Sequence, residues 1–233
     1  MTPASPICRR FLDAPLAGQR NMDVDEQLLN DALTGIPSLR FYQWNEPTVS
    51  LGHFQASNGV NVPVRFARLP VVRRLSGGGA ILHDRELTYS CALPAAHPQC
   101  PQPGQLYDRI HAAIIQVLAD RGVSCRMRGT DAFEDKSFLC FSRGDARDIV
   151  IGRQKIVGSA QRRRQGAILQ HGSILLQASS SAPEFPGIQE LSSISVSAES
   201  LIPSLSMAIL QQLDLAAGPV QSSDHLHKVA PSR

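Results

Sequence analysis

Apolar residues recur along the chain at two spacings, which predict both helices and strands. A spacing of three to four predicts helices over residues 21–33, 106–121 and 198–213. In the first helix Asn21 is expected at the N-cap, with acidic residues at 23, 25 and 26 in the first turn, where the helix dipole favours anions. Short β-branched or alternating runs predict strands over residues 40–44, 49–51, 71–74, 80–82, 88–93, 149–151, 155–161 and 167–176. Because strands and helices do not strictly alternate, we expect an α+β fold rather than a doubly wound parallel sheet.

The length of 233 residues suits one large domain with short flanking segments. We expect an N-terminal segment over residues 1–20, the main domain over 21–215, and a polar, disordered tail over 216–233. No apolar run approaches the ~18 residues of a membrane span, and the N-terminus lacks an apolar signal core. The sequence therefore predicts a cytoplasmic protein with no membrane partner.

The charge balance is close to neutral. Lys and Arg number 23 against 20 Asp and Glu, and a net charge of +3 is too small to predict nucleic-acid binding. The basic run 162–164 has no interleaved aromatic residues for base stacking, so a docking surface for an acidic protein or a solvated hairpin tip is favoured. Five cysteines without a CxxC pair predict neither a metal site nor a disulfide framework.

A glycine-rich loop is the first segment that carries chemical information. It reads RRLSGGGAILHD over residues 73–84. Glycines allow positive φ angles and a close approach of backbone to a ligand, and consecutive N–H groups can form an anion-binding nest. With two arginines beside it, such a loop suits a phosphate, a carboxylate or an acyl chain. The glycines alone equally allow a tight turn without a ligand, and the pattern is neither a Walker loop nor a GxGxxG fingerprint.

The second informative segment is centred on a lysine in an apolar strand. Lys155 lies between two glycine-containing turns, in GRQKIVGSAQ over residues 152–161. An ammonium group there is costly to desolvate unless it meets an anion, so it can bind a carboxylate or phosphate, or lower the pKa of a nearby thiol. The alternative is a solvent-facing strand lysine. His171 is a candidate base, although a lone histidine is more often a hydrogen-bonded structural residue.

Five separated blocks, in order, resemble the catalytic domain of the biotin and lipoate protein ligases. They are NMDVDE at 21–26, LRFYQW at 39–44, SLGHFQ at 50–55, the glycine-rich loop, and KIVGSAQ with QHGS at 155–161 and 170–173. The resemblance, over roughly residues 10–215, implies an α+β fold with a central mixed sheet flanked by helices. It also implies a tunnel for an octanoyl or lipoyl group, bound by Arg74, Ser76, Gly77, Gly78, Gly79, Ala80, Ile81, Leu82, His83, Gly158, Ser159, Ala160 and His171.

Within this family the chain is most similar to the cysteine-dependent octanoyltransferases, at ELTYS over residues 86–90 and at Cys140 with its neighbour Phe141. The resemblance implies that Cys140 is the nucleophile and that Lys155 lowers its pKa. The implied reaction takes an octanoyl group from octanoyl-acyl carrier protein through a Cys140 thioester to a lysine of a lipoyl domain. Glycine-cleavage H protein and the E2 subunit of a 2-oxoacid dehydrogenase are such acceptors. No cofactor is implied, and we expect a monomer.

Two alternatives stay open. The third glycine of the loop, Gly79, is shared with the lipoate–protein ligases, which use ATP and Mg²⁺ to form a lipoyl-adenylate. In that interpretation Cys140 only fills space, and Lys155 with Arg74 contacts the adenylate. The other alternative is a non-catalytic protein that binds lipoyl domains. A further difference from the octanoyltransferases is the pair Arg147-Asp148, where an aromatic residue followed by an acidic one is more usual.

Overall fold

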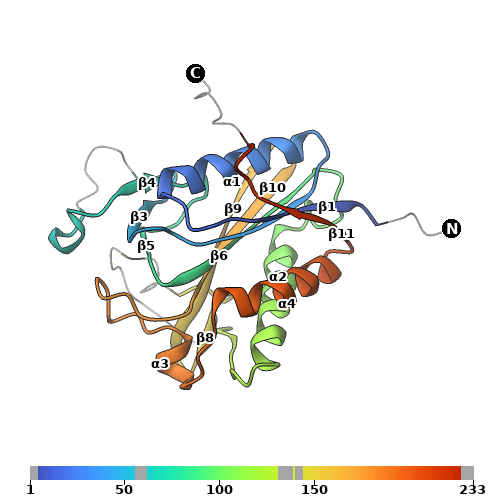
Figure 1. The fold of residues 1–233 in the computed structure, drawn as a ribbon. Helices are drawn as coiled ribbons and strands as arrows, with labels where there is room; N and C mark the ends of the chain where they lie inside the picture. The colour runs from blue at the N-terminus through green and yellow to red at the C-terminus, as the bar shows by residue number, and fades with distance from the viewer. Residues whose placement is uncertain (1–4, 56–61, 131–138, 140–143, 227–233) are drawn as a thin grey trace.

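The computed structural model describes residues 5–55, 62–130, 139 and 144–226. Within this part of the chain an eight-stranded mixed sheet has the order β11-β1-β2-β6-β10-β9-β8-β7 (Figure 1). Its strands are β1 (Ile7–Leu12), β2 (Ser38–Tyr42), β6 (Glu86–Leu93), β7 (Arg126–Met127), β8 (Ile149–Ile151), β9 (Gln154–Arg164), β10 (Ala167–Leu175) and β11 (Ala216–Gln221). Strand β1 is parallel to β2 and β11, and the other neighbours are antiparallel.

A second, three-stranded sheet has the order β4-β3-β5, formed by β4 (Val71–Arg73), β3 (Thr48–Leu51) and β5 (Ile81–His83). The helices are α1 (Gly18–Leu33), α2 (Pro103–Ala119), α3 (Ile188–Ser192) and α4 (Ala198–Gln212), with a 3-10 turn η1 (Val64–Phe66). In the described part of the chain no helix has both the length and the apolar character that crossing a bilayer requires.

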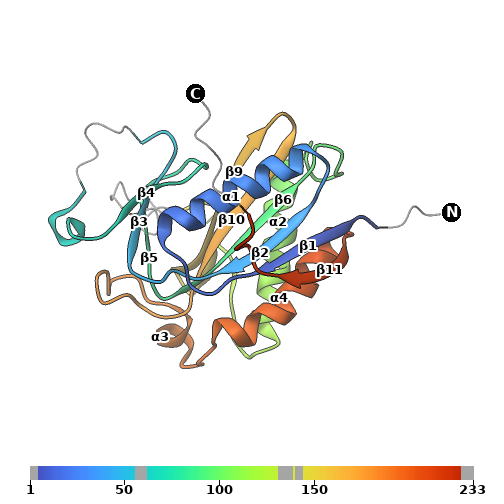
Figure 2. The same ribbon diagram turned by 45° about the horizontal axis from the view of Figure 1, so that its top comes forward.

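Helices cover both faces of the large sheet, with α1 on one face and α2 and α4 on the other (Figures 1 and 2). Strand β6 shows why. Leu87, Tyr89 and Cys91 pack in the core that contains α2 and α4, whereas Ala92 packs with Leu28 of α1. Successive side chains of a strand point to opposite faces, so a strand covered on both sides is buried along its whole length, as β6 and β10 are. The predicted α+β class is confirmed.

The N-terminus of α1 differs from the prediction. The helix begins at Gly18 with Ala17 as N-cap, and Asn21 lies fully buried within it, so the predicted cap is wrong. The Asn21 amide donates to the carbonyl of Gln43 at 3.2 Å, and its side-chain oxygen accepts from Arg40 at 2.8 Å. Tertiary partners therefore satisfy this side chain, which has no role at the helix end.

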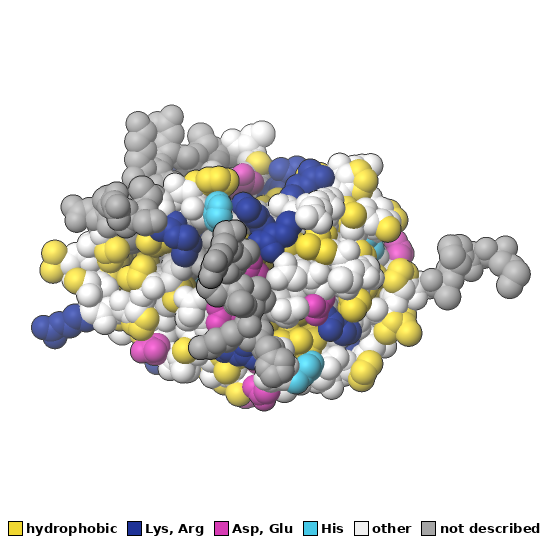
Figure 3. All heavy atoms as spheres, turned by 90° about the horizontal axis from the view of Figure 1, so that it is seen from above, with side chains coloured by type: hydrophobic (Ala, Val, Ile, Leu, Met, Phe, Trp, Pro, Cys, Tyr) yellow, Lys and Arg dark blue, Asp and Glu magenta, His cyan; other side chains and the backbone are white. Residues whose placement is uncertain are grey.

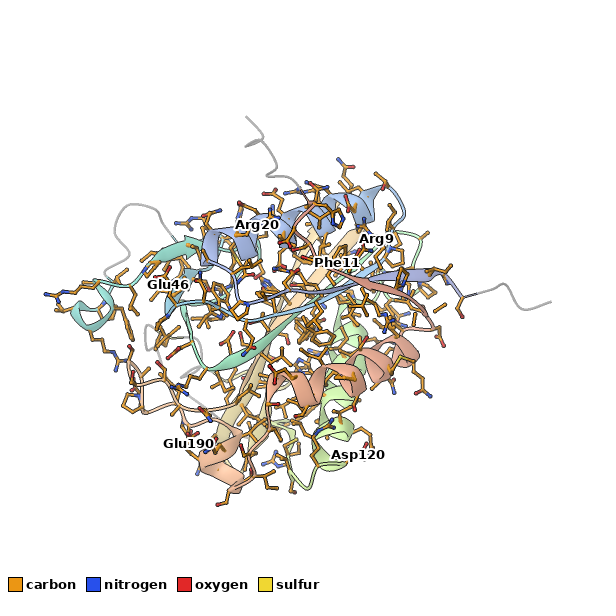
Figure 4. All side chains as sticks on the ribbon, in the orientation of Figure 1. Arg9, Phe11, Arg20, Glu46, Asp120 and Glu190 are labelled. Carbon is orange, nitrogen blue, oxygen red and sulfur yellow. The ribbon has the colours of Figure 1, made fainter. Side chains whose placement is uncertain are left out.

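The described residues of both predicted flanking segments, 5–20 and 216–226, belong to the fold. Residues 7–12 form β1, and residues 216–221 form β11 beside it, so the predicted disordered tail is wrong over this stretch. Beyond β11, Ser223 is buried, and its N–H and hydroxyl each donate to the Asp13 carboxylate at 2.7 Å. Arg20 of α1 donates to the Ser223 carbonyl. Figure 4 labels Arg20 on this helix, and Arg9 and Phe11 on β1 below it. Backbone pairing at the sheet edge orders a sequence that has no alternating apolar pattern of its own.

The basic run 162–164 is partly bound within the fold. Arg164 donates to Asn30 at 2.6 Å and to Glu26 at 3.0 Å, both on α1, and Arg163 donates to the Cys100 carbonyl. Seen from above α1, basic and acidic side chains are mixed over the surface (Figure 3). These contacts attach the end of the β9–β10 hairpin to α1 and reduce the charge available to an acidic partner.

Candidate active site

A cavity of about 400 Å³ lies among α1, α2, the glycine-rich loop and strands β9 and β10. This size is within the range of small-molecule sites. Ten of the predicted residues line it: Arg74, Gly77, Gly78, Ile81, His83, Lys155, Gly158, Ser159, Ala160 and His171. The structure therefore brings together the two segments that the sequence singled out, although about 80 residues separate them in the chain.

Four predicted residues of the loop do not line the cavity. Ser76 and Gly79 are buried behind it, and Ala80 and Leu82 pack in a separate apolar cluster with Val49 and other residues. The alternation of side chains along β5 explains the difference, because Ile81 faces the cavity and Leu82 faces the other way. The expected tunnel wall thus includes Ile81 without Leu82.

Hydrogen bonds, and glycines where a side chain would not fit, fix the conformation of the loop. The buried Arg74 guanidinium donates to the carbonyls of Gly77 and Gly79 at 2.8 and 2.6 Å. Gly78 has a φ of +94°, and a Cβ on Gly52 would lie 2.1 Å from its carbonyl oxygen. The Arg74 side chain, which the sequence suggested for binding an anion, thus holds the loop through these two hydrogen bonds.

His171 connects the loop to α1. Its Nε2 lies 2.5 Å from the Ser76 hydroxyl, and its Nδ1 lies 3.1 Å from the Asp25 carboxylate. Asp25 also accepts from Arg40 at 3.1 Å and Ser90 at 2.7 Å. Burial acts to raise the pKa of Asp25, but the His171 hydrogen bond and the Arg40 charge outweigh it and lower this pKa. Both ring nitrogens of the candidate base therefore have protein partners, and the residue positions the loop.

A second buried carboxylate lies beneath the aromatic part of the cavity. Glu86 accepts from His83, Thr88 and Ser173, each at 2.7 Å. Burial acts to raise the pKa of Glu86, but the His83 charge and these hydrogen bonds lower it. The His83 ring stacks on Trp44 with centroids 3.9 Å apart, and both rings line the cavity. Glu86 thus holds an aromatic surface in place from below.

Lys155 lies at the opposite wall with its ammonium in an ion pair. Its Nζ is 2.9 Å from the Asp148 carboxylate, and only 7% and 5% of the two side chains are exposed. A Cβ on Gly158 would lie 2.5 Å from Lys155 Cε, so the glycine provides the space into which the lysine folds. Burial raises the pKa of Asp148 despite the charges of Lys155 and Arg128. The lysine is therefore a buried cation beside the cavity and not a solvent-facing strand residue.

The structure also reveals a hydrogen-bonded chain that sequence reasoning missed. His111 of α2 lines the cavity, with Nδ1 2.6 Å from the Arg147 carbonyl and Nε2 2.7 Å from the Ser159 hydroxyl, which lies 2.8 Å from that of Tyr89. Burial lowers the pKa of His111 to about 4. The available signal was its position on the predicted helix, since residues 111, 114 and 118 share the buried side.

The predicted nucleophile, Cys140, lies outside the described residues. The nearest described residues on either side are Leu139 and Gly144. Leu139 is buried and forms a parallel bridge with Ala80, which precedes Ile81 of the cavity wall. Gly144 lines the cavity itself.

Comparison with protein families and sequences gives a consistent match. The family model of the lipoyl protein ligase A/B catalytic domain matches residues 17–198 of this chain. The octanoyltransferase LipM of Halalkalibacterium halodurans is 38% identical over 183 residues, which cover 72% of this chain and 65% of that protein. LipM of Brevibacillus brevis is 37% identical over 180 residues, with the same coverage. The chain thus spans slightly less than two thirds of the length of these relatives.

A solved structure shares the fold. A putative lipoate protein ligase from T. acidophilum with bound lipoic acid superposes with a TM-score of 0.72. The match covers 93% of this chain and 89% of the other, at 19% identity. The likeness confirms the predicted architecture of a mixed sheet flanked by helices.

Proposed function

The chain belongs to the lipoyl protein ligase A/B catalytic domain family, and within this family we propose that it is an octanoyltransferase. The proposed reaction moves an octanoyl group from octanoyl-acyl carrier protein to the ε-amine of a lysine on a lipoyl domain. Glycine-cleavage H protein and the E2 subunit of a 2-oxoacid dehydrogenase are acceptors of this kind. The names of the matched LipM relatives support the reaction class.

The buried cation in the cavity wall is the observation that carries the proposal. A thiol becomes a nucleophile as its thiolate, and a nearby cation lowers the thiol pKa. Lys155 supplies that charge, and Asp148 keeps it in place. Cys140 is the proposed thiol, and the positions of Leu139 and Gly144 support it, since one pairs beside the cavity wall and the other lines the cavity.

The thioester route explains why the reaction needs no nucleotide. In the first step the Cys140 thiolate attacks the octanoyl carbonyl, the carbon–sulfur bond to the carrier protein breaks, and the carrier sulfur leaves as a thiolate. One thioester replaces another, so the free energy changes little. In the second step the lysine amine attacks the enzyme thioester, the carbon–sulfur bond to Cys140 breaks, and Cys140 leaves as a thiol with the surplus proton of the amine, so that the more stable amide forms. The protein has to provide the thiolate, hold the acyl group and stabilise the transient oxyanion.

The apolar part of the cavity is the proposed site for the hydrocarbon chain. Met22, Trp44 and Ile81 come from three separate elements and line the same space. The fixed conformation of the glycine-rich loop places its backbone beside them. Gly77 and Gly78, which line the cavity, allow an acyl chain to approach this backbone closely.

Intact-protein mass spectrometry tests the proposal. Incubation with octanoyl-acyl carrier protein should add one octanoyl group to the chain, and peptide mapping should place it on Cys140. Cys140→Ala should abolish both the adduct and octanoyl transfer to a lipoyl domain. Cys125→Ser is the matched control and should keep both, because burial raises the pKa of this half-buried thiol to about 11. Full transfer by Cys140→Ala would exclude the thioester route.

The ATP-dependent lipoate ligase is the second candidate, since the loop retains its third glycine, Gly79. For that activity, labelling of a lipoyl domain should require lipoate, ATP and Mg²⁺, and it should survive Cys140→Ala. A protein that performs neither reaction but retains affinity for a lipoyl domain would be the non-catalytic alternative.

A further inference from the structure

Ser159 lines the cavity, and its hydroxyl has hydrogen-bond partners that leave its oxygen able only to accept. We propose that this oxygen receives an N–H of the acceptor amine during acyl transfer, and that His111 is the positioning residue that turns the Ser159 hydroxyl hydrogen away from the cavity. The inference rests on the proposed function in one respect, that an amine is acylated in this cavity.

The direction of the hydrogen bonds follows from one end of the hydrogen-bonded chain, the Arg147 carbonyl. The Arg147 carbonyl can only accept, so the hydrogen between it and His111 belongs to Nδ1. Burial keeps His111 neutral at physiological pH, which leaves a lone pair on Nε2. The Ser159 hydroxyl, 2.7 Å away, therefore donates its single hydrogen to His111.

The other end of the hydrogen-bonded chain, at the Pro103 carbonyl, leads to the same orientation of the Ser159 hydroxyl. The Pro103 carbonyl accepts from the Gln161 amide at 2.8 Å, and the same amide nitrogen donates to the Gln170 side-chain oxygen at 2.8 Å. This fixes the Gln170 amide so that its nitrogen donates to the Tyr89 hydroxyl at 2.8 Å. Tyr89 in turn donates to Ser159 at 2.8 Å. Ser159 thus has no hydrogen left to donate, and a lone pair remains for a donor in the cavity that it lines.

The hydrogen-bonded chain depends on a glycine in β10, Gly172. A Cβ on Gly172 would lie 2.3 Å from the Ser159 hydroxyl oxygen and 2.7 Å from the Tyr89 ring. The space that brings Tyr89 and Ser159 together therefore exists because residue 172 is glycine. Neither Gly172 nor Tyr89 carries a charge, and their arrangement around Ser159 sets the position of one oxygen.

A fixed acceptor beside a cation suits the chemistry of an attacking amine. The Lys155 charge disfavours a second ammonium group nearby and so favours the neutral, nucleophilic amine. An N–H bonded to Ser159 directs the nitrogen lone pair away from this oxygen, toward the acyl carbon. The C–N bond then forms, the bond from that carbon to its activating group breaks with its electron pair, and the surplus proton of the nitrogen leaves with that group. Ser159 remains a hydrogen-bond acceptor throughout.

The test separates the two half-reactions in single-turnover experiments with the full chain. Acyl-enzyme formation is followed with octanoyl-acyl carrier protein, and transfer is followed with increasing concentrations of a lipoyl domain. Ser159→Ala should form the acyl-enzyme within about twofold of the wild-type rate but transfer about 10- to 100-fold more slowly. His111→Phe should show the same split, whereas His111→Gln, whose amide can still accept from Ser159, should recover part of the loss.

The double variant Ser159→Ala/His111→Phe distinguishes positioning from general damage. If His111 acts through Ser159, the double variant should transfer no more slowly than Ser159→Ala alone. Unchanged transfer in Ser159→Ala, equal loss in both half-reactions, or additive losses in the double variant would overturn the inference.

The outcome for the wild type keeps this inference distinct from the proposed function. If the wild type forms no acyl-enzyme but labels a lipoyl domain with lipoate and ATP, the octanoyltransferase proposal fails. The same split is then measured between adenylate formation and transfer. A wild type that acylates no lysine under either condition overturns both proposals.

Discussion

The two walls of the cavity solve different physical problems. Beside α1, the carboxylates of Asp25 and Glu86 are buried, and each accepts hydrogen bonds from several elements. Beside α2, the wall carries one paired ammonium, Lys155, and a neutral chain through His111 and Ser159. Enclosed, compensated charges hold backbone segments in place, whereas groups that line the cavity contact whatever occupies it. We infer that the first wall determines mainly stability and the second mainly the reaction.

The largest effect should come from removing a charge from the α1 wall. Asp25→Ala leaves the fully buried Arg40 with Asp13 as its remaining charged partner and removes the acceptor for His171. Breaking a buried ion pair on one side typically costs about 3–5 kcal/mol, and we expect the free energy of unfolding to fall by that amount. Denaturant titration measures it. Asp23→Ala, on the same helix but bonded to Gln19 at the surface, should change it by less than about 1 kcal/mol. Similar values for the two variants would contradict the assignment of the α1 wall to stability.

Removing the cation from the α2 wall should slow catalysis. Lys155→Ala should slow octanoyl transfer by roughly 100- to 1,000-fold, in the range seen for the loss of one preorganised electrostatic group. Steady-state transfer to a lipoyl domain measures the effect. Arg153→Ala is the control, since this exposed residue lies two positions away outside the cavity lining. A normal rate for Lys155→Ala would remove the lysine from the site, and an equally slow Arg153→Ala would point to a general effect of positive charge.

The neutral histidine of the α2 wall should make stability depend on pH. The folded protein holds the pKa of His111 at about 4, below the value of about 6.5 for an unfolded chain. As pH falls from 6.5 toward 4, the unfolded state therefore binds an additional proton, and stability is lost. Over this window the wild type should lose up to about 3 kcal/mol more than His111→Gln, measured by denaturant titration at each pH. Parallel pH profiles for the two proteins would contradict a buried, neutral His111.

The sequence predicted the cavity better than it predicted the hydrogen-bonded networks in its two walls. The glycine-rich loop and the strand lysine are local patterns whose chemistry can be predicted from the residue types alone. Both segments line the same cavity. The hydrogen bond between His111 and Ser159 joins a helix to a strand 48 residues later in the sequence. No residue spacing within either element predicts that hydrogen bond. The strand β11 was missed for a similar reason. Its sequence has no alternating pattern, and it is ordered by backbone pairing to β1 at the other end of the chain.

The smallest effect should come from an ion pair at the edge of the α2 wall. Arg147 donates to Asp108 at 2.9 Å, but nearly half of each side chain is exposed, and such pairs contribute about 0–1 kcal/mol. Arg147→Ala removes this pair while keeping the backbone carbonyl that receives the hydrogen of His111. We therefore expect the free energy of unfolding to change by less than about 1 kcal/mol, with the loss shrinking as salt is added, and the pH dependence due to His111 to persist. Denaturant titrations at two salt concentrations and at pH 4.5 and 7 measure both properties. If Arg147→Ala instead removed the pH dependence, the exposed guanidinium would be responsible for the environment of His111, and the distinction between an enclosed chain and its solvent-exposed edge would be wrong.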